Sequence, residues 1–138
     1  MNQLRDDLLF GDIHAAGNHK VYRRYSVDVV VKLCGLDPLP EYPDDVEAID
    51  CSMPDGESNT VDEFRKAVSV VLEKRDEGGT VFVHCAAGNS RSVTVVAAVL
   101  AITEDNEFQG VLDEIRESVN VDPEPALVEN GDQVVREQ

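Results

Sequence analysis

Two short runs of β-branched apolar residues, at 27–34 and 80–84, form the clearest hydrophobic pattern of the chain. Gly35 ends the first run, and apolar runs of this length without polar alternation are typical of strands buried on both faces of a sheet. We therefore predict two central strands. A shorter strand is expected over Val46–Cys51, after a loop over Asp37–Asp45 that contains three of the six prolines.

A helical period begins at Thr60, after a loop over Ser52–Asn59. Thr60 can cap the backbone N–H of Glu63, and the Glu63 side chain can reach back to Thr60, which is the pattern of a capping box. Gly78 and Gly79 end the segment. The apolar residues that share one face of this predicted helix are Val61, Phe64, Val68, Val71 and Leu72.

Four more helices follow from similar signals. An apolar helix is expected to begin near Arg91, and a short one around 19–25. Asn106 is a candidate N-cap for a further helix, and Pro123 or Pro125 is expected to begin the last one. The inner face predicted for the helix after Asn106 consists of Phe108, Leu112, Ile115 and Val119.

The order of these elements predicts the fold class. Buried strands that alternate with helices indicate an α/β fold with a central, mostly parallel sheet of about four to five strands and helices on both faces. The 138 residues fit a single domain, 1–138, because this length can bury a core without staples and leaves no room for a second. There is no internal repeat.

Charge changes the picture of the surface. The chain has 12 basic and 28 acidic residues, a net charge of −16, and the acids are spread along its whole length. Such a surface should repel nucleic acid and anionic membranes. The excess of Asp and Glu over Lys resembles proteins of salt-in halophilic archaea, in which molar salt screens the repulsion.

The terminus and the longest apolar run bear on location. The first ten residues carry two acids where a secretory signal would carry basic residues, and the apolar run at 93–102 is about half as long as a membrane span requires. We expect a soluble, cytoplasmic protein, monomeric by default. His14 and His19 have no partner pattern and are expected at the surface.

Three cysteines, Cys34, Cys51 and Cys85, are too few and too irregularly spaced for a disulfide framework or a zinc site, so no metal is expected. A reducing compartment fits this usage. Cys34 and Cys51 end predicted strands and are expected in the core, although either could approach Cys85 and form a reversible disulfide under oxidation.

The segment His84–Ser92, HCAAGNSRS, carries the chemistry. A cysteine at the end of a strand is followed six residues later by an arginine at the start of a helix. The backbone N–H groups of this loop can turn inward around a phosphate, Gly88 permits the backbone angles that such a nest requires, and the helix adds its positive end. The residues expected to bind substrate are Ala86, Ala87, Gly88, Asn89, Ser90 and Arg91.

The same dipoles should stabilise a thiolate, which makes Cys85 the expected nucleophile. Arg91 can grip two phosphate oxygens with its planar fork. Ser92 offers a hydroxyl near the sulfur to assist the departure of the thiolate, and His84 is expected to support the loop. A cysteine after a strand is more often a small buried hydrophobe, but the coincidence of His, Cys, Gly, Arg and Ser outweighs that interpretation.

HCAAGNSRS resembles the HCxxGxxRS signature of the dual specificity branch of the protein tyrosine phosphatases, and every fixed position matches. A weaker similarity covers nearly the whole chain, in LLFGDIHAAGN, VVVKLC, MPDG and VNVDPEPAL. The resemblance implies phosphate monoester hydrolysis through a phosphocysteine, without a cofactor. It also implies a general acid on the loop before the central helix, where Asp55 matches.

Alternatives remain at this point. Asp55 could be a simple turn residue, with Asp50 or Asp62 as the acid instead. A sulfurtransferase or an arsenate reductase could use a similar cysteine loop, and a phosphoprotein-binding module could use it without turnover. The expected substrates are phosphotyrosine, phosphoserine or phosphothreonine in proteins, or small phosphomonoesters. The absence of Lys from the signature disfavours phosphoinositides.

Overall fold

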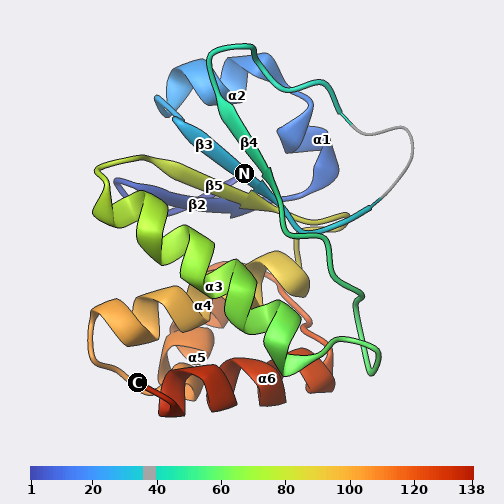
Figure 1. Cartoon of the computed structure of the whole chain (residues 1–138), viewed down its shortest axis with the longest axis vertical. Helices are drawn as coiled ribbons and strands as arrows, with labels where there is room; N and C mark the ends of the chain where they lie inside the picture. Colours follow the sequence, from blue (N-terminus) through green and yellow to red (C-terminus); the bar gives the residue numbers. More distant parts are fainter. Residues whose placement is uncertain (36–39) are drawn as a thin grey trace.

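A five-stranded sheet forms the centre of the molecule (Figure 1). The structure is a computed structural model and describes residues 1–35 and 40–138. The strand order is β1-β2-β5-β3-β4. Only β1 runs antiparallel, against β2, and the other three pairs are parallel. The strands are β1 (Asn2–Arg5), β2 (Leu8–Gly11), β3 (Val29–Lys32), β4 (Glu47–Asp50) and β5 (Val81–His84).

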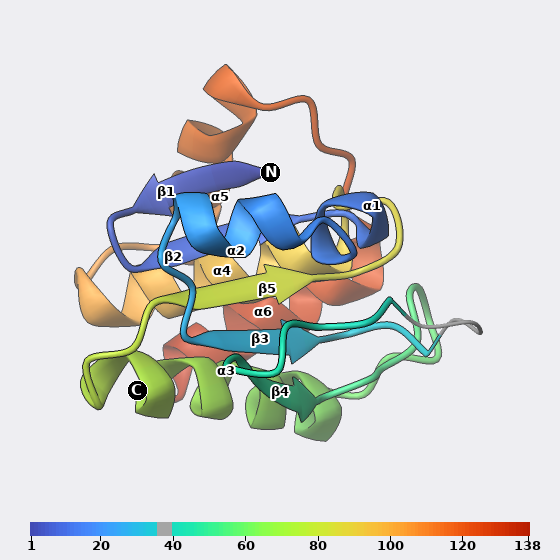
Figure 2. The same cartoon turned by 90° about the horizontal axis from the view of Figure 1, so that it is seen from above.

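Helices cover both faces of this sheet (Figure 2). The short helices lie on one face and the four longer helices on the other, which confirms the prediction that helices cover both faces. The helices are α1 (Ile13–Ala16), α2 (His19–Arg24), α3 (Val61–Asp76), α4 (Arg91–Thr103), α5 (Phe108–Ser118) and α6 (Pro125–Arg136).

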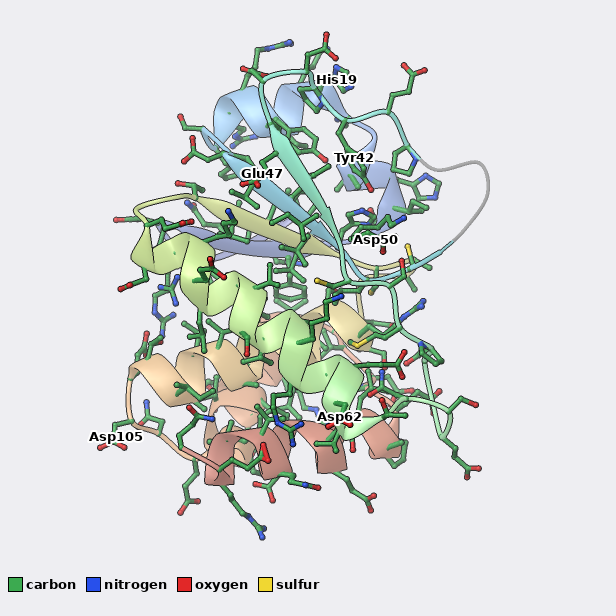
Figure 3. All side chains as sticks on the ribbon, in the orientation of Figure 1. His19, Tyr42, Glu47, Asp50, Asp62 and Asp105 are labelled. Carbon is green, nitrogen blue, oxygen red and sulfur yellow. The ribbon has the colours of Figure 1, made fainter. Side chains whose placement is uncertain are left out.

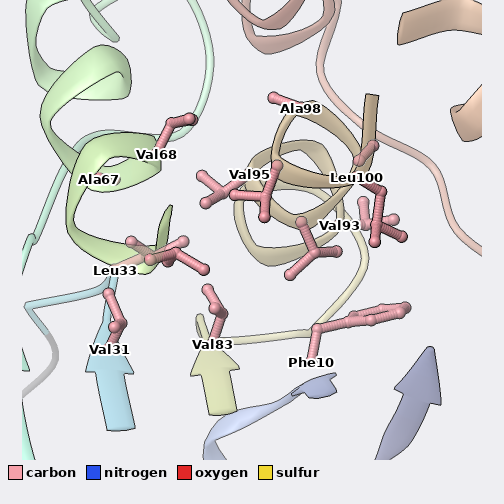
Figure 4. Packing of buried hydrophobic residues seen from close by; sticks show 14 of the residues in the cluster. Phe10, Val31, Leu33, Ala67, Val68, Val83, Val93, Val95, Ala98 and Leu100 are labelled. Carbon is pink, nitrogen blue, oxygen red and sulfur yellow. The ribbon is translucent and has the colours of Figure 1, made fainter. Parts of the chain in front are cut away.

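The pleat of the strands divides the core into two layers. Leu9, Val30 and Phe82 point to the α1 and α2 side. Their neighbours along the same strands point to the larger cluster beneath α3 to α6. Figure 4 shows part of that cluster, in which Phe10, Val31 and Val83 face residues of α3 and α4.

Helix α4 is the centre of the larger layer. Every residue from Ser92 to Ala101 is buried, because α3, α5, α6 and the sheet surround the helix. A helix that is apolar on all sides is stable only in such a place. This packing fixes the start of α4, and with it Arg91 and Ser92, relative to the sheet.

The predicted elements agree well with the observed ones. The capping box of α3 is present, with Thr60 Oγ1 accepting from Glu63 N at 3.2 Å and Glu63 Oε1 accepting from Thr60 N at 3.2 Å. Pro125 occupies the first turn of α6. The strand predicted at 27–34 is confirmed but shorter, as β3, and the beginning of the predicted loop Asp37–Asp45 lies outside the described residues.

One predicted cap is wrong. Glu107, not Asn106, is the N-cap of α5, and no side chain caps that helix. The Asn106 backbone N–H donates instead to Ala101 O at 2.9 Å, which ties the residue to the end of α4. The hairpin of β1 and β2 was not predicted, and neither was the helix α1, which has only four residues.

Candidate active site

The four parallel strands end at one edge of the sheet, at Gly11, Lys32, Asp50 and His84. The segments that follow them therefore meet above this edge (Figure 1). In open α/β sheets this edge is the usual place for a ligand. The signature segment follows β5, which is the middle strand of the five.

The signature loop is held by the turn between β2 and α1. Cys85 N donates to Gly11 O at 3.3 Å, and Ile13 N donates to Ala86 O at 3.0 Å. Gly88 has a φ of +74°, and a Cβ on it would lie 2.8 Å from Asp12 N. Both the backbone angle and the close approach require glycine.

Cys85 lies at the floor of this loop with only 2% of its surface exposed. Its Sγ is 3.2 Å from Ser92 Oγ and accepts from Ser92 N at 3.4 Å. Ser92 belongs to the first turn of α4, where the helix presents unpaired N–H groups and partial positive charge. The sulfur thus has a hydroxyl and a backbone N–H of Ser92 within hydrogen-bond distance.

Arg91 bridges the signature loop and the loop before α3. Its Nη1 donates to Met53 O at 3.1 Å. Its Nε is buried and has no acceptor among the described residues. A buried donor without an acceptor is costly in a folded protein, and a bound oxyanion would satisfy it.

Asp55 lies on the loop between β4 and α3, and its side chain contacts the signature loop. Its Oδ1 accepts a hydrogen bond from Ser90 Oγ at 2.8 Å. The carboxylate is otherwise exposed, and the turn that carries it contains Gly56 with a φ of +92°. The candidate nucleophile and the candidate acid therefore belong to loops in direct contact.

The two competing carboxylates are engaged elsewhere. Asp50 accepts from Ser52 Oγ at 2.6 Å, and the hydroxyl and backbone N–H of Ser52 hold the pKa of Asp50 below its ordinary value. A carboxyl group of this kind is a poor proton donor at neutral pH. Asp62 pairs with Arg65 on the first turn of α3. Figure 3 shows Asp50 at the end of β4 and Asp62 well apart from it.

His84 is the last residue of β5, directly before the signature loop, and is fully buried. Its Nδ1 lies 3.3 Å from Cys85 O, and its Nε2 lies 2.7 Å from Tyr42 Oη. Burial lowers the pKa of His84 below 6.5, and Lys32 and Arg91 act in the same direction. A neutral ring that donates from Nδ1 and accepts from Tyr42 fits both contacts. Burial raises the pKa of Tyr42 to about 12, so its hydroxyl remains a donor.

Tyr42 was missed by the sequence analysis. It is separated from His84 by 42 positions, and no local pattern connects the two residues. A second missed feature is the segment between α5 and α6, where Asp122 N donates to Asn89 O at 3.1 Å and Glu124 N donates to Ser90 Oγ at 2.9 Å. The only signal for it was the similarity of VNVDPEPAL to a family element.

The remaining candidates lie as follows. Ala87 is the exposed residue of the signature loop, whereas Ala86 and Asn89 are half-buried. Cys34 and Cys51 are buried, and none of the three cysteines forms a disulfide. His14 and His19 are exposed, as expected.

Two further searches of the described residues gave negative findings. No group of three or more His, Cys, Asp or Glu side chains in the described part of the chain is arranged to hold a metal ion. Within the same residues, none of the helices combines the length and apolar character needed to cross a bilayer.

Comparison with known proteins gives the family. Residues 13–122 match the family "Dual specificity phosphatase, catalytic domain". The chain is 33% identical over 98 residues to Dual specificity protein phosphatase 1 of Arabidopsis thaliana, an alignment that covers 70% of this chain and 49% of that protein. The chain thus spans about half the length of this relative.

Two further similarities concern a short segment and the fold. Over 41 residues the chain is 49% identical to human Phosphatidylglycerophosphatase and protein-tyrosine phosphatase 1, covering 30% of this chain and 20% of that protein. The crystal structure of human DUSP28 has the same fold, with a TM-score of 0.87 at 18% identity, covering 99% of this chain and 96% of that one. The chain belongs to the dual specificity phosphatase family, as its signature segment suggested, and corresponds to the catalytic domain of that family.

Proposed function

We propose that this protein hydrolyses phosphate monoesters through a phosphocysteine intermediate on Cys85. The observation that carries the proposal is the convergence of three groups on one loop. The Cys85 sulfur lies beside Ser92 at the N-terminus of α4. The Arg91 Nε is buried and has no acceptor among the described residues, and Asp55 accepts a hydrogen bond from Ser90 of the signature loop.

In the first step the Cys85 thiolate attacks phosphorus, and the bond from phosphorus to the leaving oxygen breaks. The Asp55 carboxyl donates its proton to that oxygen. The loop N–H groups and Arg91 hold the remaining phosphoryl oxygens, whose charge is spread in the transition state. Since Arg91 is anchored to Met53 O, its fork needs little reorganisation.

In the second step the Asp55 carboxylate accepts a proton from water as the water oxygen attacks phosphorus. The S–P bond breaks, inorganic phosphate leaves and the thiolate returns to Cys85. The Ser92 hydroxyl, 3.2 Å from the sulfur, can donate to the departing thiolate. Thiolate stabilisation therefore serves both steps, with no metal or cofactor in either.

The contact between Asp55 and Ser90 favours hydrolysis over the other uses of a cysteine loop. A sulfurtransferase needs no acid aimed at a leaving oxygen, and a phosphoprotein-binding module needs neither acid nor nucleophile. The family supports phosphorylated substrates, and we propose phosphotyrosine, phosphoserine or phosphothreonine in proteins.

A small or lipid-borne phosphomonoester is the second candidate, because the 49% identity over 41 residues is to a phosphatidylglycerophosphatase. A panel of Tyr, Ser and Thr phosphopeptides, inositol phosphates and phosphatidylglycerophosphate separates the two candidates. We also propose that the domain works as a monomer in a reducing cytoplasm. Because its net charge is −16, we propose that this cytoplasm is rich in salt.

The function is tested with p-nitrophenyl phosphate in the presence of a chelator, at low and at molar KCl. Cys85→Ser should abolish turnover, and vanadate should inhibit the wild type competitively. Cys51→Ser, at another buried cysteine, is the matched control and should retain activity. Turnover that persists in Cys85→Ser would rule out the mechanism.

A further inference from the structure

The hydroxyl of Ser90 is committed to two partners on two other segments. Glu124 N donates to Ser90 Oγ at 2.9 Å, and Ser90 Oγ donates to Asp55 Oδ1 at 2.8 Å. A backbone N–H can only donate, so Ser90 must accept from Glu124. The single hydroxyl proton then points to Asp55.

Ser90 itself is held firmly. Its side chain is only 3% exposed, and its carbonyl accepts from Thr94 Oγ1 at 2.8 Å. The preceding residue, Asn89, accepts a hydrogen bond from Asp122 N, which is a second connection between the signature loop and the segment between α5 and α6. The hydroxyl therefore has a fixed direction before any substrate binds.

Asp55, in contrast, is exposed on a turn. A side chain of this kind samples several rotamers unless a contact selects one. Because its Oδ1 accepts from Ser90, the other oxygen, Oδ2, is left as the one that can carry the transferable proton. The hydrogen bond thus fixes both the orientation of the carboxyl group and the oxygen that holds the proton.

We propose that the Ser90 side chain is a positioning residue for the general acid, holding Asp55 against the signature loop with Oδ2 available for proton transfer. This role rests on the proposed function and goes beyond the backbone contact with phosphate expected of Ser90. Ser90 acts through Asp55 and does not itself exchange a proton with the substrate.

Ser90→Ala should lower kcat/KM, which reports only the step in which the phosphocysteine forms and Asp55 acts as the acid. General acid catalysis contributes roughly 10²–10⁴-fold, so loss of its orientation should cost about 10-fold or more with phenyl phosphate, whose leaving group needs a proton. The loss should be under about 3-fold with p-nitrophenyl phosphate, because that leaving group departs as an anion and depends less on the acid. Ser90→Thr, which keeps the hydroxyl, should restore most of the rate.

The decisive comparison uses Asp55→Asn. If Ser90 acts through Asp55, then Ser90→Ala in the Asp55→Asn background should cause no further loss of kcat/KM with phenyl phosphate. Ser52→Ala is the matched control, because it removes an equivalent serine hydroxyl from Asp50 at the start of the loop that carries Asp55. It should leave both substrates unaffected.

Equal losses with both substrates, or a full additional loss in the Asp55→Asn background, would overturn the assignment. If Ser90→Ala does not fold, Ser90→Cys provides the same comparison with a side chain that is a weak donor. The outcome is separable from the proposed function, since Cys85-dependent turnover by the wild type is measured first. That turnover can stand whichever way the Ser90 variants behave.

Discussion

At the scale of single residues, the shape of the signature loop depends on Gly88. Its φ of +74° and the 2.8 Å approach to Asp12 N leave no room for a side chain. Gly88→Ala should therefore displace the loop and lower kcat/KM by about a hundredfold or more, since small misplacements in an active site are this costly. Assays with p-nitrophenyl phosphate check this, with Gly110→Ala, a glycine in open space, as the control. Activity within about threefold of wild type would contradict it.

His84 gives a prediction for pH. Burial lowers its pKa below 6.5, so between pH 6.5 and the lower folded value the unfolded chain binds more protons than the folded one. The free energy of unfolding should therefore be unaffected by the titration of His84 above pH 6.5. It should fall as the pH drops below 6.5, by at most about 1.4 kcal/mol per pH unit. Urea denaturation from pH 7.5 to 5 should show the fall in wild type and in His14→Gln, but a shallower one in His84→Gln. Equal slopes in all three would count against it.

At the scale of elements, α5 and α6 pack closely at Gly131. A Cβ on Gly131 would lie 2.6 Å from the ring of Phe108. Because Phe108 is itself buried, the ring has little space to move. Gly131→Ala should lower the free energy of unfolding by about 1–3 kcal/mol, as other overpacked cores do. Chemical denaturation measures this, and a variant as stable as wild type would show that the helices can separate freely.

The elements also show how far the sequence leads. Segments with a strong period and a clear start, such as α3 with its capping box, were predicted closely, because local hydrogen bonds decide them. The hairpin of β1 and β2 was missed, since β1 is mostly polar in sequence, and no local pattern encodes its pairing with β2 or that of β2 with β5. The N-cap of α5 was misplaced by one residue because a contact with α4 claims Asn106.

In the candidate site, too, features set by a local pattern could be predicted and long-range contacts could not. Cys85, Arg91 and Ser92 lie within eight consecutive residues, so their grouping could be predicted from one motif. The contact of Asp55 with Ser90 joins residues 35 positions apart, and that of Tyr42 with His84 joins residues 42 positions apart. Such contacts arise only when the sheet brings its loops to one edge, and no local pattern encodes them.

At the scale of the whole molecule, the net charge predicts that stability depends on salt. Figure 3 shows side-chain oxygens projecting on all sides of the ribbon, consistent with a net charge of −16. The Debye length falls from about 10 Å at 0.1 M salt to about 3 Å at 1 M, so salt should relieve the repulsion. The temperature of unfolding should rise between 0.1 M and 2 M KCl by more than in sucrose of equal osmolarity. A temperature that is unchanged or lower in KCl would refute this.

The central claim is that the sulfur of Cys85 becomes phosphorylated during turnover. Rapid acid quenching of the enzyme with p-nitrophenyl phosphate, followed by mass spectrometry of the peptides, tests it directly. Asp55→Asn provides the most sensitive sample, because without the base the intermediate should accumulate. The account predicts one phosphoryl group on the peptide containing Cys85, and none in Cys85→Ser. Turnover without phosphorylation of Cys85, or with phosphate on another residue, would contradict the account.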